Sequence, residues 1–227
     1  MDYKNRGTIM KRNIYLLPIN NDFNIVKYNN LLTFVSEKKI TQLNELKNNM
    51  DKKLSLYAHI AVKLIIQKEL SLDISKISIV YDDLGKPFVE DLENTFFSIS
   101  HTYDMIAIAF SNSKVGIDIE KETENSVDIA KYFFTEKEKE YISVSCVNPQ
   151  KAFLEIWTKK EAFIKYLGLG LRKRLDDFCV INDFLKDNFY TIQSDDYILS
   201  YYDGCNKAGI EIKNITEKEI EELRINS

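Results

Sequence analysis

The chain has 227 residues, of which 44% are hydrophobic and 29% charged, and its formal net charge is -4. This length allows one large domain or two small ones, and the composition is ordinary for a soluble globular protein and not for a disordered chain. The negative net charge gives no general case for nucleic-acid binding, so any basic patch would have to be local.

The first half of the chain is predicted to start with a strand and to continue with helices, at 14–17, 24–35, 36–47 and 51–70. Ser36 and Asp51 are the expected N-caps of the second and third helices. The third is the clearest, because an apolar stripe recurs along it at helical spacing. Its members are Leu54, Tyr57, Ile60, Ala61, Leu64 and Ile65. His59 lies in this helix and is assigned no role.

Strands are expected next, at 77–81, 96–100, 105–110 and 115–120, with turns at 82–85 and 111–113. The segment 105–110 is apolar on both faces, which predicts a central strand. Thr135 and Glu138 then form a capping-box pattern at the start of a helix. Asn148 and Pro149 suit the first positions of a further helix that reaches Leu167 and ends at Gly168.

The last quarter of the chain is predicted to hold strands at 178–182, 189–193, 197–202 and 209–213, followed by a helix that starts at Thr216. Each half therefore runs helices first and strands afterwards, which predicts an α+β fold, as two similar lobes related by a pseudo-two-fold axis. The expected domains are 1–115 and 116–227. Residues 1–9 are polar and precede Met10, so they are either a frayed tail or an upstream start.

Asp118 and Glu120 are the first candidates for chemistry. Apolar and acidic residues alternate over 115–120, so both carboxylates should lie on one face of a strand, about 7 Å apart. This spacing suits two carboxylates that converge on one divalent cation. The alternative is an edge strand with a solvated acidic face.

The helix over 149–167 adds a third carboxylate. Trp157, Glu161 and Lys165 recur at every fourth position and so line one side. Lys160 falls within the apolar arc of the same helix, where a lysine must be paired, and the strand carboxylates are its expected partners. The alternative for Glu161 and Lys165 is an exposed ion pair.

Other polar residues have two interpretations each. Ser100 and His101 end a strand and could donate to a phosphate, or His101 could simply bond the backbone. Lys86 follows the turn glycine Gly85, and Lys39 starts a helix; each could meet a phosphate or remain solvated. Glu138 is either a helix cap or a base near the metal.

The three cysteines, Cys146, Cys179 and Cys205, have no metal-type spacing, which favours a reducing, cytoplasmic location. The apolar run over 14–19 is too short for a signal sequence, and no stretch approaches the roughly 20 apolar residues that span a bilayer. We therefore expect no membrane and no nucleic-acid partner.

Several segments, taken in order, resemble the 4'-phosphopantetheinyl transferases of the surfactin-synthetase-activating (Sfp) type. The similarity runs from about Ile14 to the last strand, and the matching segments are Gly85–Pro87, Phe97–His101, Val115–Glu120, Phe133–Glu138, Trp157–Lys165 and Gly168–Leu171. The pairing of Gly-Ile-Asp-Ile-Glu with Trp-x-x-Lys-Glu-x-x-x-Lys is the most specific part of the match.

The resemblance implies two α+β lobes with coenzyme A bound in the cleft between them. It implies transfer of the phosphopantetheine arm of coenzyme A to a serine of an apo carrier protein, with release of adenosine 3',5'-bisphosphate. Fatty-acid, polyketide and peptide-synthetase carriers are all possible acceptors, and the pseudo-dimeric layout suggests a monomer.

The resemblance also implies a role for each candidate residue. Asp118, Glu120 and Glu161 would hold Mg²⁺, with Mn²⁺ as an alternative. Lys39, Ser55, Lys86, Ser100 and His101 would contact coenzyme A, with His101 at the 3'-phosphate. Lys165 would neutralise or protonate the leaving phosphate, and Glu138 would be the base for the carrier serine. Gln42 departs from the family's basic pattern, which bears on coenzyme A affinity.

A second hypothesis is a coenzyme A or carrier-protein binding module without catalysis, and a third is a metal-dependent phosphohydrolase. The segment 121–134, with its aromatic residues Tyr132, Phe133 and Phe134, could present apolar groups to a carrier helix. Phe133 and Phe134 could equally belong to the core.

Overall fold

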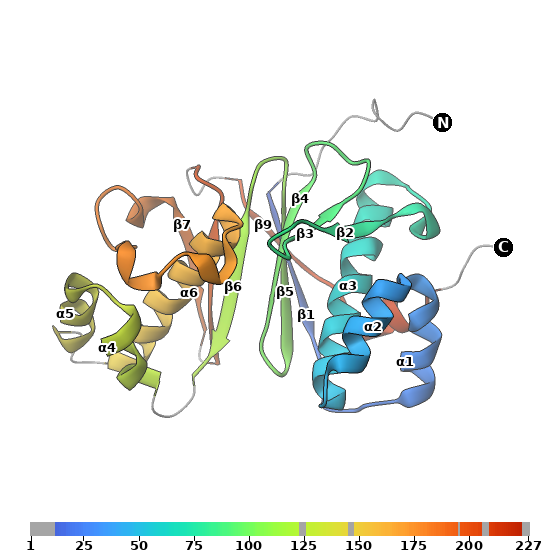
Figure 1. Cartoon of the computed structure of the whole chain (residues 1–227), viewed down its shortest axis with the longest axis horizontal. Helices are drawn as coiled ribbons and strands as arrows, with labels where there is room; N and C mark the ends of the chain where they lie inside the picture. The colour runs from blue at the N-terminus through green and yellow to red at the C-terminus, as the bar shows by residue number, and fades with distance from the viewer. Residues whose placement is uncertain (1–11, 123–125, 145–147, 195, 206–208, 224–227) are drawn as a thin grey trace.

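The structure is a computed structural model of the chain, in which we describe residues 12–122, 126–144, 148–194, 196–205 and 209–223 (Figure 1). The polar segment 1–9 lies outside the described residues. Helices and two main sheets alternate along the chain, which confirms the predicted α+β class. None of the helices in the described residues combines the length and apolar character needed to cross a membrane.

The first sheet has the strand order β4-β5-β1-β9. Its members are β1 (Asn13–Pro18), β4 (Phe96–His101), β5 (Met105–Ser111) and β9 (Glu211–Asn214). β5 pairs antiparallel with both β1 and β4, so the expected central position of the apolar segment 105–110 is confirmed. A separate hairpin joins β2 (Ile79–Tyr81) to β3 (Pro87–Val89), a strand that the sequence analysis did not predict.

Three helices accompany this sheet: α1 (Ile25–Leu31), α2 (Glu37–Glu45) and α3 (Asn49–Leu70). Ser36 caps α2 as predicted, since its side chain accepts a hydrogen bond from the Lys39 amide. The predicted cap of α3 was wrong, because Asn48 and not Asp51 accepts from a first-turn amide. α3 is buried on nearly every side in its middle, and its apolar residues form one core with β1, β4 and β5.

The second sheet has the order β6-β8-β7, with all pairs antiparallel. Its strands are β6 (Gly116–Lys121), β7 (Phe189–Gln193) and β8 (Tyr197–Tyr202). The helices on this side are α4 (Ala130–Phe133), α5 (Glu136–Val144) and α6 (Pro149–Leu167). Asn148 caps α6 and Gly168 ends it at a φ of 71°, both as predicted. The strand predicted at 178–182 was wrong, since those residues form turns and irregular chain.

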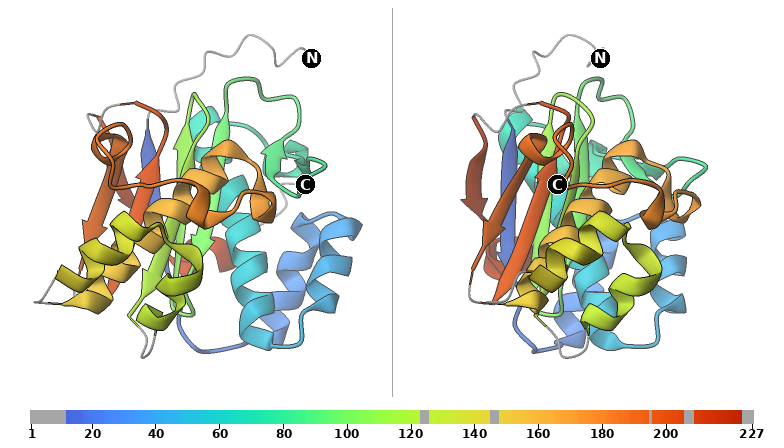
Figure 2. Two further views of the ribbon diagram at one scale, coloured as in Figure 1. Left: turned by 60° about the vertical axis from the view of Figure 1, so that its left-hand side comes forward. Right: turned by 90° about the vertical axis from the view of Figure 1, so that its left-hand side faces the viewer.

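The two sheets pack against each other in the middle of the molecule. Ile14 and Ala107 of the first sheet share a buried cluster with Ile117 and Leu199 of the second. The helices α1–α3 cover one outer side and α4–α6 the other, as Figure 1 shows and the turned views in Figure 2 repeat. The long helices α3 and α6 thus occupy comparable places, while the pseudo-two-fold relation of the halves stays a prediction. Short 3₁₀ turns cover Leu32–Phe34, Ile74–Lys76, Ser126–Ile129, Gly170–Arg172, Leu175–Asp177 and Lys186–Asn188.

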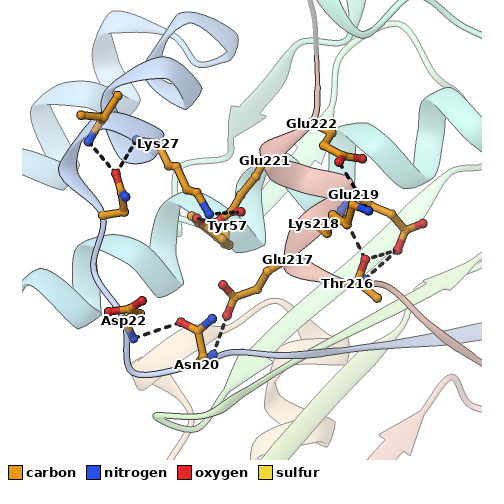
Figure 3. A network of polar contacts seen from close by, with 12 residues as sticks. Asn20, Asp22, Lys27, Tyr57, Thr216, Glu217, Lys218, Glu219, Glu221 and Glu222 are labelled. Atoms are coloured by element: carbon orange, nitrogen blue, oxygen red, sulfur yellow. Dashed lines mark hydrogen bonds and ion pairs between the residues drawn. The ribbon is translucent and has the colours of Figure 1, made fainter.

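The end of the chain returns to the N-terminal side. β9 runs parallel to β1, and the helix α7 (Glu217–Glu221) docks beside α3. Figure 3 shows the polar contacts of α7: Glu221 accepts from Lys27 Nζ at 2.6 Å and from the Tyr57 hydroxyl at 3.0 Å. The capping box predicted at Thr216 and Glu219 is confirmed. The division at 115/116 remains a prediction, and it assigned this returning strand and helix to the C-terminal lobe, whereas β9 pairs with β1 of the first sheet.

Candidate active site

The candidate site forms where β6 meets α6, and Gly116 allows the contact. A Cβ atom on Gly116 would lie 1.9 Å from the carbonyl oxygen of Ala162 and 2.5 Å from the amide nitrogen of Tyr166. Only glycine lets the strand backbone come this close to the helix backbone. As a result Asp118, two residues further along β6, faces the side of α6 that carries Glu161 and Lys165.

Asp118 is the most buried of the predicted metal ligands, at 3% exposure. Its Oδ1 accepts hydrogen bonds from Ser100 Oγ and from Lys165 Nζ, each at 2.7 Å. Its Oδ2 is enclosed and has no hydrogen-bond partner within the part of the chain that the structure describes. A buried carboxylate oxygen without a partner is unfavourable, so this atom is suited to an additional ligand.

Glu120 and Glu161 lie close enough to Asp118 for their charges to interact. Burial, and then the charge of Asp118, raise the pKa of Glu120 to about 7, while Lys165 and a hydrogen bond with Trp157 oppose the change. Burial and Asp118 raise the pKa of Glu161 as well, again with Lys165 opposing. The sequence therefore correctly predicted that these carboxylates share one region, and Lys165 alone does not neutralise them.

Among the described residues, no three His, Cys, Asp or Glu side chains are already arranged as a metal site. The chemistry of the region nevertheless fits a hard divalent cation. It offers a carboxylate oxygen of Asp118 that has no partner among the described residues, and two further carboxylates with raised pKa values. Magnesium prefers a few carboxylate ligands together with phosphate and water oxygens, and these three residues match that preference.

A cavity of about 240 Å³ brings together three residues predicted to contact coenzyme A, namely Lys39, Ser55 and His101. Lys39 is buried and donates to Ser55 Oγ at 2.9 Å, and its burial lowers its pKa. Desolvation, and then the charge of Lys165, lower the pKa of His101, although the residue as a whole is exposed. Ser55 and His101, which are far apart in the sequence, thus line one cavity, and their contact with coenzyme A stays a prediction.

A larger cavity of about 680 Å³ lies beside it and is lined by residues from both halves of the chain, including Lys86, Glu161 and Lys165. Lys86 Nζ donates to the backbone carbonyl of Lys165 at 2.5 Å and to that of Val115 at 3.5 Å, so it links the β2–β3 turn to the end of α6. Its burial lowers its pKa. A phosphate contact of Lys86 stays a prediction.

Pro87, Phe97 and Ile99 line both cavities, and the sequence analysis assigned them no role. Each of them is next to a polar residue in the sequence, namely Lys86, Ser98 or Ser100. This adjacency could have identified them as residues that line the site. The aromatic residues 132–134 have different environments. Phe134 is 2% exposed and belongs to the core. Tyr132 and Phe133 are 68% and 42% exposed and line the larger cavity.

Glu138 is fully buried and is not part of the acidic cluster that Asp118, Glu120 and Glu161 form. Its Oε2 accepts from the amide and hydroxyl of Thr135 and pairs with Lys160 at 2.8 Å, and its Oε1 accepts from the Val180 amide. The capping alternative is the one that this geometry supports. A role as general base stays a prediction, and it would require Glu138 to exchange these partners for the acceptor hydroxyl.

The expected partner of Lys160 was wrong. Lys160 pairs with Glu138 of α5 and not with the carboxylates of β6, and it also donates to the carbonyls of Leu175 and Phe178. The helical pattern correctly predicted that Lys160 is buried and so needs a partner. The partner differs because α5 and the segment 175–178, and not β6, cover that part of α6. Because Leu175 lines the larger cavity, this buried pair holds part of the cavity wall.

Comparison with known proteins agrees with this arrangement. Residues 114–215 match the family model described as "4'-phosphopantetheinyl transferase superfamily", and residues 23–113 match "4'-phosphopantetheinyl transferase, N-terminal". The chain is 33% identical to 4'-phosphopantetheinyl transferase Sfp of Bacillus subtilis (strain 168), over 66% of this chain and 67% of that protein. It is 28% identical to 4'-phosphopantetheinyl transferase gsp of Aneurinibacillus migulanus, over 86% of each. The chain therefore belongs to the 4'-phosphopantetheinyl transferase superfamily and is an Sfp-type transferase enzyme.

Proposed function

We propose that this enzyme transfers the 4'-phosphopantetheine arm of coenzyme A to a serine of an apo acyl or peptidyl carrier protein in a Mg²⁺-dependent reaction. The other product is adenosine 3',5'-bisphosphate. The observation that carries the proposal is the acidic cluster between β6 and α6, in which Asp118 Oδ2 has no partner among the described residues. The family membership supports the transferase class, and the cluster supports the need for a cation.

Asp118, Glu120 and Glu161 are the residues that would hold Mg²⁺. When bound, the ion neutralises negative charge on the pyrophosphate of coenzyme A. Burial, and then the charge of Asp118, raise the pKa values of both Glu120 and Glu161, so a bound cation would relieve part of this cost. Three carboxylates with one lysine leave the site with excess negative charge, which favours a cation over a phosphate alone.

The two cavities suggest how coenzyme A is divided between them. The smaller one offers the cation Lys39, the hydroxyl of Ser55 and the ring of His101 to the phosphate-bearing nucleotide end. The larger one has a mostly apolar lining with Lys165 and Glu161 at its polar side, and suits the pantetheine arm. Phe97 and Ile99 line both cavities, so the two adjoin and one extended coenzyme A molecule would span their boundary. Ser100 would act through its hydrogen bond to Asp118.

In the reaction, the serine oxygen of the carrier attacks the phosphorus that bears pantetheine, and the bond from that phosphorus to the bridging oxygen breaks. The serine proton leaves to a base, and the bridging oxygen stays with the adenosine bisphosphate. The ammonium of Lys165 is partly exposed and lies 2.7 Å from Asp118, where it can stabilise charge that develops on the departing phosphate. Tyr132 and Phe133 are exposed at the cavity and available to the carrier.

Intact-protein mass spectrometry tests the proposal directly. An apo carrier mixed with the enzyme, coenzyme A and Mg²⁺ should gain the mass of one phosphopantetheine, and EDTA should prevent the gain. Excess Mg²⁺ added after EDTA should restore it. A gain that persists in EDTA would contradict the metal dependence. No gain with several carrier classes, despite measured binding of coenzyme A, would contradict the carrier-modifying reaction.

A further inference from the structure

Two buried lysines have no acidic partner among the residues that the structure describes. The described residues include five buried lysines, Lys39, Lys53, Lys63, Lys159 and Lys160. Lys53, Lys159 and Lys160 each form an ion pair, with Glu217, Glu155 and Glu138 respectively. Lys39 and Lys63 form none in the described structure: Lys39 donates to Ser55 Oγ at 2.9 Å and Lys63 to the Phe34 carbonyl at 2.7 Å. A buried ammonium without a counter-charge is unfavourable, so both are suited to an anionic ligand.

His59 lies near both lysines and is likewise without a side-chain partner in the described part of the chain. It is 6% exposed, and no hydrogen bond or ion pair joins its side chain to another described residue. Its ring nitrogens are not sealed in the core, because the side chain lines two cavities. Burial, followed by the charges of Lys39 and Lys63, lowers the pKa of His59 to about 3. The imidazole is therefore neutral at physiological pH and has a free nitrogen to offer to a ligand.

Of the two cavities that His59 lines, one is the cavity already described, with Lys39, Ser55 and His101. The other is separate from it and has a volume of about 270 Å³. Lys63 lines it from α3, and the exposed residues Ser36, Ser75 and Ser78 form its rim. His59 and Ile79 line both cavities and so form their common wall. The rim gives access from solvent, and the volume exceeds what a single water molecule fills.

The sequence of α3 places the polar groups in one row. Ser55, His59 and Lys63 recur at every fourth position, so they share one side of a helix whose other middle residues are mainly apolar. Ser55 faces the first cavity, His59 faces both and Lys63 faces the second. No carboxylate of the described residues pairs with these three side chains. The simplest explanation for a polar row along a buried helix is therefore that it binds a ligand.

We infer that the cavity lined by His59 and Lys63 is an anion site that binds a phosphate group. The Lys63 ammonium, the His59 imidazole and the hydroxyls of Ser36 and Ser78 together provide several donors, and the oxygens of a phosphate can accept from all of them, whereas the Ser75 hydroxyl already donates to Asp73. This site lies beyond the residues that the proposed function assigns to coenzyme A. The phosphate can come from free inorganic phosphate or from a nucleotide that reaches past the shared wall.

The chain contains two histidines, which makes the test specific. The side-chain NMR signals of His59 and His101 would be followed in the full-length protein while inorganic phosphate is added. We expect the His59 signals to shift and its pKa to rise. Lys63→Met should weaken phosphate binding roughly ten- to hundredfold, as expected for a lost charge-assisted hydrogen bond, whereas Lys63→Arg should retain it. Lys76→Met, an exposed lysine nearby that does not line the cavity, is the matched control.

Coenzyme A titrations of the same variants identify the source of the phosphate. Coenzyme A affinity that is unchanged in Lys63→Met, with phosphate and coenzyme A bound together, supports a site for free phosphate. Weaker coenzyme A binding in Lys63→Met, with competition by phosphate, supports a nucleotide phosphate in the same site. Equal shifts of His59 and His101 that persist in Lys63→Met would place the anion in the neighbouring cavity and overturn the inference. Absence of any shift in wild type at millimolar phosphate, together with unchanged coenzyme A affinity, would also overturn it. None of these readings depends on transfer activity.

Discussion

Lys165 Nζ and Asp118 Oδ1 lie 2.7 Å apart across the contact between α6 and β6, and the second oxygen of the same carboxylate has no hydrogen-bond partner in the described structure. The lysine therefore occupies one side of Asp118 and leaves the other side for a ligand. The oxygen that we propose to bind the cation and the ammonium that we propose to stabilise the leaving phosphate therefore meet at one carboxylate. It relates the two predicted functions of the site to a single buried residue.

Asp118→Asn should abolish most transfer and leave the fold intact. The amide oxygen can still accept from Ser100, but it offers no negative charge to a cation or to Lys165. We expect a loss of transfer of roughly 100-fold or more, as for removal of other preorganised electrostatic groups, measured by carrier mass gain. Asp104→Asn is the control, because Asp104 pairs with Lys121 at 2.7 Å and lines neither described cavity. Near-normal transfer by Asp118→Asn would refute its assignment.

The stability of the metal-free protein should depend on pH through Glu120. Its pKa is raised from 4.5 to about 7 in the folded state, so folding favours the protonated form. The associated stability is fully present below pH 4.5 and is lost as the pH rises through 7, by at most about 3 kcal/mol since part of the side chain is solvated.

Denaturant unfolding at pH 5 and pH 8 checks this expectation. Glu120→Gln should remove most of the difference between the two pH values and stabilise the metal-free protein at pH 8. Addition of Mg²⁺ should stabilise wild type at pH 8 more than it stabilises the variant. Identical pH dependence in wild type and Glu120→Gln would show that Glu120 does not carry the raised pKa.

Gly116→Ala should destabilise the protein and disrupt the site together. The added Cβ would lie 1.9 Å from the Ala162 carbonyl oxygen, so β6 and α6 must move apart. Such overpacking typically costs about 1–3 kcal/mol, and more where backbone has to shift. Gly209→Ala is the comparison, because Gly209 has a φ of 78° but no atom within 4 Å of its added Cβ. If Gly116→Ala proved no more destabilising than Gly209→Ala, the close strand–helix contact would be wrong.

Glu138→Gln separates a structural role from a catalytic one. Removing one charge of the buried pair with Lys160 should cost about 3–5 kcal/mol, measured by thermal or denaturant unfolding. The double variant Glu138→Leu with Lys160→Met removes both charges and should recover part of that stability. Transfer that recovers with the fold in the double variant would assign Glu138 to structure. A folded double variant without transfer, which still binds coenzyme A, would support its predicted role as base.

The sequence by itself determined the parts of the molecule that depend on local periodicity and local capping. The alternation over 115–120 placed Asp118 and Glu120 on one strand face, and the four-residue spacing placed Glu161 and Lys165 on one helix side. Ser36, Asn148, Gly168 and the Thr216–Glu219 box act within a few residues of themselves, so their predictions were confirmed. The cap of α3 was missed because Asn48 and Asp51 are both good capping residues, and only the backbone at Asn48 is extended.

Only the tertiary structure decided which distant segments meet. The need of Lys160 for a partner was local, but the choice of Glu138 over the β6 carboxylates depends on how α5 packs against α6. The return of β9 to β1 depends on pairing across nearly the whole chain. The lack of an acidic partner for Lys39 and Lys63 could likewise be recognised only from the tertiary structure, because it depends on where the described carboxylates lie. Periodicity determines the face on which a residue lies, whereas packing determines what that face touches, and it is the contact that sets charge, burial and chemistry.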